Sequence, residues 1–135
     1  MTIRYSTALR NTLMTTTADG GLPMAEIFSG ATLSFYSGEQ PDDPDDAMVG
    51  ELLLEITGVS FGTASGGAIA IPTSPTLSGF VQESYTVQSF RLEGTGGESL
   101  DGSVGADGDI RFLSHQWEES ETLEVTSLTL TMPME

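Results

Sequence analysis

The amino-acid sequence predicts a mainly β protein, an antiparallel β-sandwich of Ig-like or jelly-roll-like type with a short N-terminal helix. Apolar and polar residues alternate over several short segments after Gly30, which is the pattern of half-buried strands. Clusters of Gly, Pro, Asp and Ser separate these segments. In two of the segments the alternation changes phase midway, as happens where a strand contains a bulge or crosses between two sheets.

Residues 1–20 are expected to form an N-terminal helix or arm. Ser6 suits the N-cap position, and Tyr5, Leu9 and Leu13 recur every four residues to give one apolar stripe. A helix this short is marginally stable in water, so its stripe must pack against the rest of the protein or against a neighbouring subunit. The sequence leaves both alternatives open.

The rest of the chain, residues 21–135, is expected to form one β-sandwich domain, since its length is close to the commonest domain size. The expected strands are Ala31–Ser37, Glu51–Ile56, Ala68–Ile71, Ser84–Leu92, Ser99–Val104, Asp109–Leu113 and Leu123–Met132. Exposed loops are expected at 37–50 and 72–79, which are polar and rich in proline. Glycine-rich hairpin turns are expected at 94–97 and 106–108.

Phase changes fall in two of the expected strands. Tyr85 and Val87 share one face, whereas Phe90 and Leu92 take the opposite parity. The strand Leu123–Met132 shows the same change. Each predicts a bulge or a crossing between sheets.

Composition removes much of the usual catalytic chemistry. The chain has no cysteine, a single histidine, and four Lys plus Arg residues, all of them Arg, against twenty carboxylates, for a formal net charge of −16. No thiolate or lysine amine is present to act as a nucleophile. The negative charge opposes binding to nucleic acid or to anionic membrane surfaces, so neither is expected as a partner. We therefore expect no enzymatic activity, no cofactor and no metal.

Three groups of polar residues are candidates for chemistry. The acidic run at 42–46 offers oxygen ligands for a hard cation, but Pro44 stiffens it, and a solvated loop is the preferred interpretation. Asp101, Asp107 and Asp109 lie in the segment LDGSVGADGDI, whose Asp-Gly pairs are of the kind found in hairpin turns, and that interpretation is preferred to a calcium motif. His115 and Trp117 lie close together, but adjacent strand residues point to opposite faces, so we expect Trp117 to be a half-exposed interface residue.

Several motifs together carry a resemblance. They are STALRN at 6–11, LSFYSGEQP at 33–41, GELLLEI at 50–56, LDGSVGADGDI at 100–110 and VTSLTLTMP at 125–133. In this order they resemble a family of small structural proteins from the virions of tailed bacteriophages, and the likeness extends over nearly the whole chain. The resemblance implies a virion component and supplies no catalytic residues. The DDPDD sequence makes this chain more acidic than the family pattern, which would suit a phage of a saline host.

Three functions remain open from the sequence. The first is a capsid decoration or cement protein that stabilises the head shell, forms homo-oligomers, most naturally trimers, and contacts the major capsid protein or other virion proteins. The second is a tail or neck subunit, as part of a tube, terminator or fibre base. The third is a host-surface carbohydrate-binding module with Tyr36, Tyr85 and Trp117 as sugar-stacking aromatics. The first two imply localisation in a virion assembled in the host cytoplasm, and the residues expected at interfaces are Tyr5, Leu9, Leu13, Tyr36 and Trp117.

Overall fold

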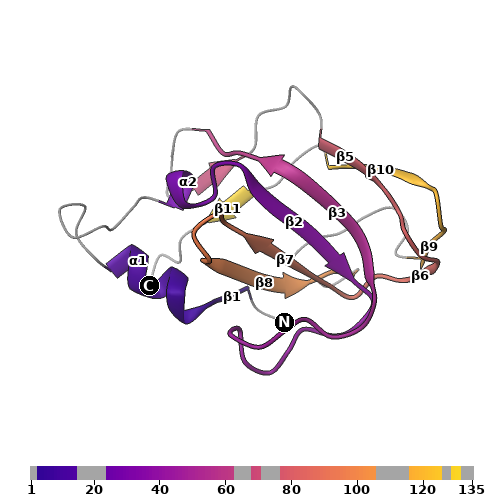
Figure 1. The fold of residues 1–135 in the computed structure, drawn as a ribbon, viewed down its shortest axis with the longest axis horizontal. Coiled ribbons are helices and arrows are strands. Elements are labelled where there is room, and N and C mark those ends of the chain that lie inside the picture. Colours follow the sequence, from indigo (N-terminus) through magenta and orange to yellow (C-terminus); the bar gives the residue numbers. More distant parts are fainter. Residues whose placement is uncertain are drawn as a thin grey trace.

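The computed structural model of the chain describes residues 3–14, 24–62, 68–70, 77–105, 116–125 and 129–131. Within these ranges the protein is mainly β, all strand pairs are antiparallel, and a short helix lies near the N-terminus (Figure 1). The predicted fold class is therefore confirmed. Of the helices in the described ranges, none is long and apolar enough to cross a membrane.

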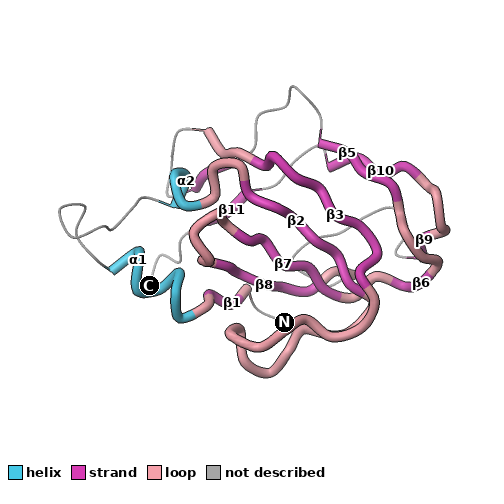
Figure 2. Tube along the Cα trace, in the orientation of Figure 1, coloured by secondary structure: helices cyan, strands magenta, loops and turns pink. Residues whose placement is uncertain are grey.

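In the described residues the main sheet has five strands in the order β1-β8-β7-β2-β3 (Figures 1 and 2). Its strands are β1 (Arg4–Tyr5), β8 (Ser99–Ser103), β7 (Ser89–Glu93), β2 (Ala31–Tyr36) and β3 (Leu52–Val59). The turn at 94–97 joins β7 to β8 as predicted, and Gly97 adopts a φ of 94° that glycine accommodates without strain.

The shorter strands of the described ranges form three two-stranded sheets. They are β5 (Leu77–Phe80) with β10 (Thr122–Val125), β4 (Ala68–Ala70) with β11 (Thr129–Thr131), and β6 (Tyr85–Thr86) with β9 (Gln116–Trp117). Two contacts place two of these sheets, β6-β9 and β5-β10, against the apolar face of the main sheet. The ring of Trp117 lies edge-on to Phe35 at 5.4 Å between centroids, and Gly79 lies against the Leu54 side chain. This second layer gives the molecule its sandwich character.

Alternation along the central strands places the core on one face of the main sheet. Leu33 and Phe35 of β2 are flanked by Ile56 and Leu54 of β3 in register. On the other side they are flanked by apolar residues of β7, and all of these side chains are at most 3% exposed. Burial of this face by the second layer and the helices supplies the main driving force for folding.

Helix α1 (Thr7–Met14) is fastened to the main sheet. The Ser6 hydroxyl oxygen accepts hydrogen bonds from the backbone N–H of Leu9 (3.1 Å) and of Ser99 (3.0 Å), so the predicted N-cap is confirmed and also joins the helix to β8. The Leu9 side chain is fully buried. Since β1 precedes this helix in the same chain segment, residues 3–14 belong to the same core as the sheet. A second, short helix, α2 (Met24–Ile27), was not predicted and leads into the buried Phe28.

Both phase changes correspond to changes of sheet, as predicted. The chain pairs with β9 at Tyr85–Thr86 and then enters the main sheet as β7. Likewise, Thr122–Val125 pairs with β5 whereas Thr129–Thr131 pairs with β4. The register between β2 and β3 also shifts twice, which marks local irregularities in that pair.

Two expectations were wrong and two lie outside the described residues. Residues 77–79, expected in a loop, belong to strand β5, because backbone pairing with β10 outweighs the local proline-rich composition. The expected strand Ser99–Val104 is confirmed as β8, so the turn interpretation of the Asp-Gly pair at Asp101 is wrong: Asp101 lies in the middle of this strand and is fully buried. The expected strand Asp109–Leu113 and the turn at 106–108 lie outside the described residues.

Candidate functional site

The face of the main sheet opposite the core carries the most concentrated group of polar interactions in the described part of the chain. The register aligns one row of residues across all five strands, in the order Arg4, Asp101, Arg91, Ser34 and Glu55. Neighbouring side chains on one face of an antiparallel sheet lie within contact distance. The row therefore alternates cation, anion and cation at its β1 end and finishes with a carboxylate on β3.

Asp101 is the centre of this row. One of its carboxylate oxygens accepts a hydrogen bond from Gln40 Nε2 at 2.5 Å, and the other accepts from Arg91 Nη2 at 3.1 Å. Arg4 Nε lies 3.8 Å from the carboxylate. The side chains of Asp101 and Arg91 are 1% and 11% exposed, so the pair has been removed from water and depends on these partners.

The two arginines also hold the acidic loop, which we define as residues 37–50. Arg4 donates to the backbone carbonyls of Pro41 (2.5 Å) and Asp42 (2.8 Å), and Arg91 donates to that of Pro44 (3.2 Å). The sequence predicted a solvated loop. Its carboxylates at 42, 43, 45 and 46 are indeed exposed, but its backbone is fixed to the sheet by cations that sequence reasoning had not connected to it.

The start of helix α1 provides a further attachment for the acidic loop. Asp45 accepts hydrogen bonds from the Thr7 backbone N–H (2.7 Å) and from the Thr7 hydroxyl. These bonds, with a smaller effect of the nearby Arg10 and Arg91, lower the pKa of Asp45 below its ordinary value. A carboxylate at a helix N-terminus is also favoured by the helix dipole. In the described residues no group of three or more His, Cys, Asp or Glu side chains is arranged to hold a metal ion.

Two glycines close the neck of the acidic loop. The N–H of Gly38 donates to the carbonyl of Val49 at 3.1 Å, and a Cβ on Gly38 would collide with that carbonyl. Gly50 has a φ of 89°, and its Cβ would meet the backbone of Gly38. The close approach of the two backbone segments therefore requires glycine at both positions.

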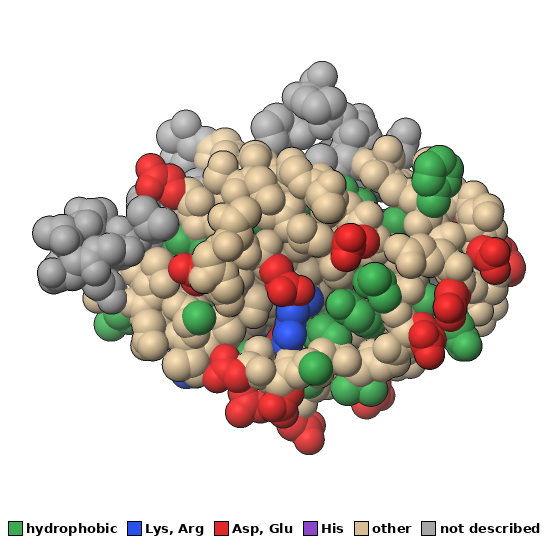
Figure 3. Space-filling model, in the orientation of Figure 1, with side chains coloured by type: hydrophobic (Ala, Val, Ile, Leu, Met, Phe, Trp, Pro, Cys, Tyr) green, Lys and Arg blue, Asp and Glu red, His purple; other side chains and the backbone are tan. Residues whose placement is uncertain are grey.

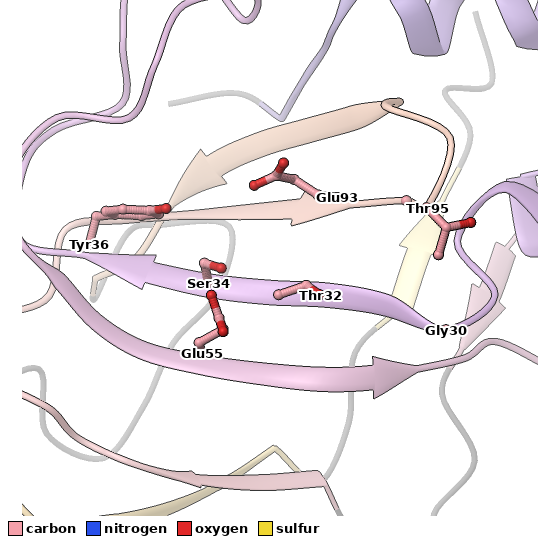
Figure 4. Close-up of a pocket in the computed structure, with 8 residues that line it drawn as sticks. Gly30, Thr32, Ser34, Tyr36, Glu55, Glu93 and Thr95 are labelled. Carbon is pink, nitrogen blue, oxygen red and sulfur yellow. The ribbon is translucent and has the colours of Figure 1, made fainter.

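Beyond the acidic loop the polar face is open and forms a shallow groove of about 320 Å³ (Figure 4). It is lined by Gly30, Thr32, Ser34, Tyr36, Glu55, Glu93, Gly94 and Thr95. Figure 4 shows that Glu93 and the Tyr36 ring project over the same face, with Ser34 and Glu55 beside them. Burial and the neighbouring Glu93 and Glu55 raise the pKa of Tyr36, despite opposing effects of Ser34 and Arg91. The carboxylates in this groove have no described arginine as a hydrogen-bonded partner.

The charged surface around this face is dominated by carboxylates. Figure 3 shows acidic side chains spread over the side of the molecule seen in Figure 1, whereas the arginine surface is confined to small areas. Arg4 and Arg91 are engaged with the acidic loop and with Asp101. The exposed charge is therefore mostly of one sign.

The structure separates the residues predicted at interfaces. Trp117 is 2% exposed and packs against Phe35, so the prediction of a half-exposed interface residue is wrong, because the strand β9 turns this side chain into the core. Leu9 is likewise buried, so it packs against the rest of the protein and not against a neighbouring subunit. Tyr5 lies in strand β1 and not on the helix as expected, because the helix begins at Thr7, after the Ser6 cap; Tyr5 and Leu13 are partly buried against the core. Tyr36, expected near the sheet edge, lies in the groove on the inner strand β2.

The remaining sequence candidates are not brought into a reactive arrangement. His115 lies outside the described residues, and Trp117, its neighbour in sequence, is a core residue. Sequence reasoning missed the cluster of Arg4, Gln40, Arg91 and Asp101. The sequence does contain a signal for this cluster. Arg4 and Arg91, two of the four basic residues of the chain, each lie beside apolar residues in a short strand.

Comparisons with protein-family models, with curated proteins and with solved structures found no match to this chain.

Proposed function

We propose that this protein is a structural component of a tailed-bacteriophage virion, a decoration or cement protein that binds the outside of the head shell. Its partner would be the major capsid protein, and its assembly a homo-oligomer, with a trimer as the favoured form. The resemblance of the five ordered sequence motifs to small phage structural proteins is the origin of this proposal. It assigns no catalytic residue and no cofactor.

The acidic loop is the observation that carries the proposal. A decoration protein has to present a stable outer surface that keeps particles apart, and like charge on that surface provides repulsion between particles. Here the exposed carboxylates at 42–46 are presented by a loop whose backbone carbonyls bind Arg4 and Arg91 and whose Asp45 carboxylate binds Thr7. The arrangement combines a rigid β domain with a fixed acidic surface.

Cosedimentation tests the proposal. Purified protein is mixed with heads assembled from the major capsid protein and, separately, with purified tails, in buffer containing salt. Saturating binding to heads alone is the expected result, and the number of copies per head then reports the symmetry. Binding to tails alone would favour the tail or neck alternative, and binding to neither would refute a virion role.

The carbohydrate-binding alternative has lost part of its basis. It required Tyr36, Tyr85 and Trp117 to be exposed together, whereas Trp117 is 2% exposed. Tyr36 lines the groove, and Tyr85, which is 50% exposed, lies on β6. A sugar site would have to rely on one aromatic residue at a time, and stacking platforms normally need more.

A further inference from the structure

We propose that the groove on β2, β3 and β7 binds an arginine side chain from a basic, extended segment of a partner protein. The inference concerns the groove residues themselves and holds whether or not the partner is a capsid protein. Its central elements are the carboxylates of Glu55 and Glu93, which lie on opposite sides of β2.

The register fixes where these carboxylates stand. Glu93 of β7 is opposite Thr32, and Glu55 of β3 is opposite Ser34, so the acids flank a line of hydroxyl groups on β2 that ends at Tyr36. Every side chain with a polar group that lines the groove is therefore a carboxylate or a hydroxyl. The groove offers hydrogen-bond acceptors at several points, and none of its described lining residues is a cation.

Charge complementarity selects the occupant. The nearest arginine of the main sheet, Arg91, donates through Nη2 to Asp101 and to the Pro44 carbonyl, on the side of the acidic loop. Arg91 precedes Glu93 by two residues on β7, but in the described residues no ion pair joins an arginine to Glu93 or Glu55, so both carboxylates can attract a cation from a partner. A guanidinium group carries five N–H donors in a fixed planar arrangement, which suits acceptors on more than one strand better than the compact ammonium of lysine.

The aromatic ring adds a second reason for arginine. Tyr36 forms one end of the groove, with its ring over the sheet surface (Figure 4). A guanidinium stacks on the face of an aromatic ring while it donates to carboxylates in its plane. The volume of about 320 Å³ is at the lower end of the range for ligand sites and suits one side chain with its adjoining backbone.

Titration with short peptides, followed by amide chemical shifts in the NMR spectrum of the whole protein, tests this inference. The probe is a blocked Gly-Arg-Gly peptide, and the comparison peptide carries citrulline, which has nearly the shape of arginine but no charge. We expect the arginine peptide to shift the amides of Gly30, Gly94 and Thr95, and the citrulline peptide to leave them unchanged.

A matched pair of variants separates the groove from general attraction to an acidic protein. The double substitution Glu55→Gln with Glu93→Gln is expected to weaken binding by about tenfold or more, since charge-assisted hydrogen bonds are lost. The control, Glu39→Gln with Glu119→Gln, removes the same charge from exposed positions and should change the dissociation constant by less than about twofold.

Three results would overturn the inference. Equal weakening in both double variants would indicate non-specific charge attraction. Shifts confined to the acidic loop would place the binding elsewhere. Shifts of the groove amides by neutral sugars but not by the arginine peptide would identify a saccharide as the occupant. Thermal unfolding of each variant, compared with the unmodified protein, shows that loss of binding does not arise from loss of fold.

Discussion

Substitution of Asp101 by Asn tests whether the buried ion pair holds the acidic loop. One carboxylate oxygen of Asp101 accepts a hydrogen bond from Gln40 and the other accepts one from Arg91, and the residue is fully buried. An asparagine amide keeps one acceptor oxygen and replaces the other with a donor, so one of these partners would face an N–H group. It also leaves the Arg91 charge without its counter-ion.

The expected cost follows from this loss. Removing one partner of a buried pair typically destabilises a protein by about 3 to 5 kcal/mol. That is a large fraction of the total stability of a domain, which is commonly about 5 to 15 kcal/mol. Urea unfolding followed by circular dichroism measures the change. The matched control is Asp42→Asn, whose side chain is exposed and whose interaction with Arg4 is through the backbone carbonyl, so its cost should stay below about 0.5 kcal/mol.

A second substitution keeps the test informative if Asp101→Asn unfolds the protein. Replacing Arg91 by Leu in the same chain removes the uncompensated charge, and we expect the double variant to be more stable than Asp101→Asn alone. Hydrogen exchange provides a structural measure, because amides such as that of Asp46, which donates to the carbonyl of Asp43 within the loop, should exchange faster in Asp101→Asn. A stability equal to that of Asp42→Asn, with unchanged exchange in the loop, would refute the role assigned to the pair.

Three further predictions follow from the same structure. Trp117→Ala should destabilise the fold by about 3 to 5 kcal/mol because it leaves a cavity in the core, as measured by urea unfolding, and a near-neutral effect would return Trp117 to the surface. Gly38→Ala should lower the free energy of unfolding more than Gly58→Ala in the same assay. A Cβ at Gly38 meets the Val49 carbonyl, whereas Gly58, at a φ of 73°, has open space around it. Equal losses of stability would contradict the close approach at the loop neck. The lowered pKa of Asp45 means that its bonds to Thr7 stabilise the fold above the ordinary value of 3.8 and are lost as pH falls through the lowered value. Thr7→Val removes the hydroxyl donor but keeps the backbone N–H, so it should raise the pKa of Asp45 in an NMR titration, and an unchanged pKa would argue against the hydroxyl bond.

Local pattern was sufficient to predict most of the fold. The alternation of Leu33 and Phe35 predicts a strand with one buried face. In the structure this strand, β2, pairs with β3 on one side and with β7 on the other. The change of phase between Val87 and Phe90 marks the transfer of the chain from one sheet to another. These signals are contained within a few residues, so a single sequence is enough to see them.

The acidic loop and the buried ion pair were beyond sequence reasoning because they depend on contacts between distant parts of the chain. Asp101 stands next to a glycine and has the local signature of a turn. Its burial is understood only when β8 is seen between β1 and β7, with Arg4 on one side and Arg91 on the other. Trp117 was misplaced for the same reason, since its polar neighbours indicated exposure while its partner Phe35 lies far away in sequence.

The arrangement of charge on the polar face has a consequence for any partner. Arg4 and Arg91 neutralise Asp101 and hold the acidic loop, whereas Glu93, two residues after Arg91 on β7, and Glu55, on β3, form no ion pair with an arginine among the described residues. Attraction of a basic segment to the open groove should therefore be specific in position and sensitive to ionic strength, since partly exposed charges are screened over about 8 to 10 Å at physiological salt. The ion pair around Asp101 is buried and should be much less affected. Raising the salt concentration should thus release a partner from the groove well before it loosens the loop, which separates binding from folding in one titration.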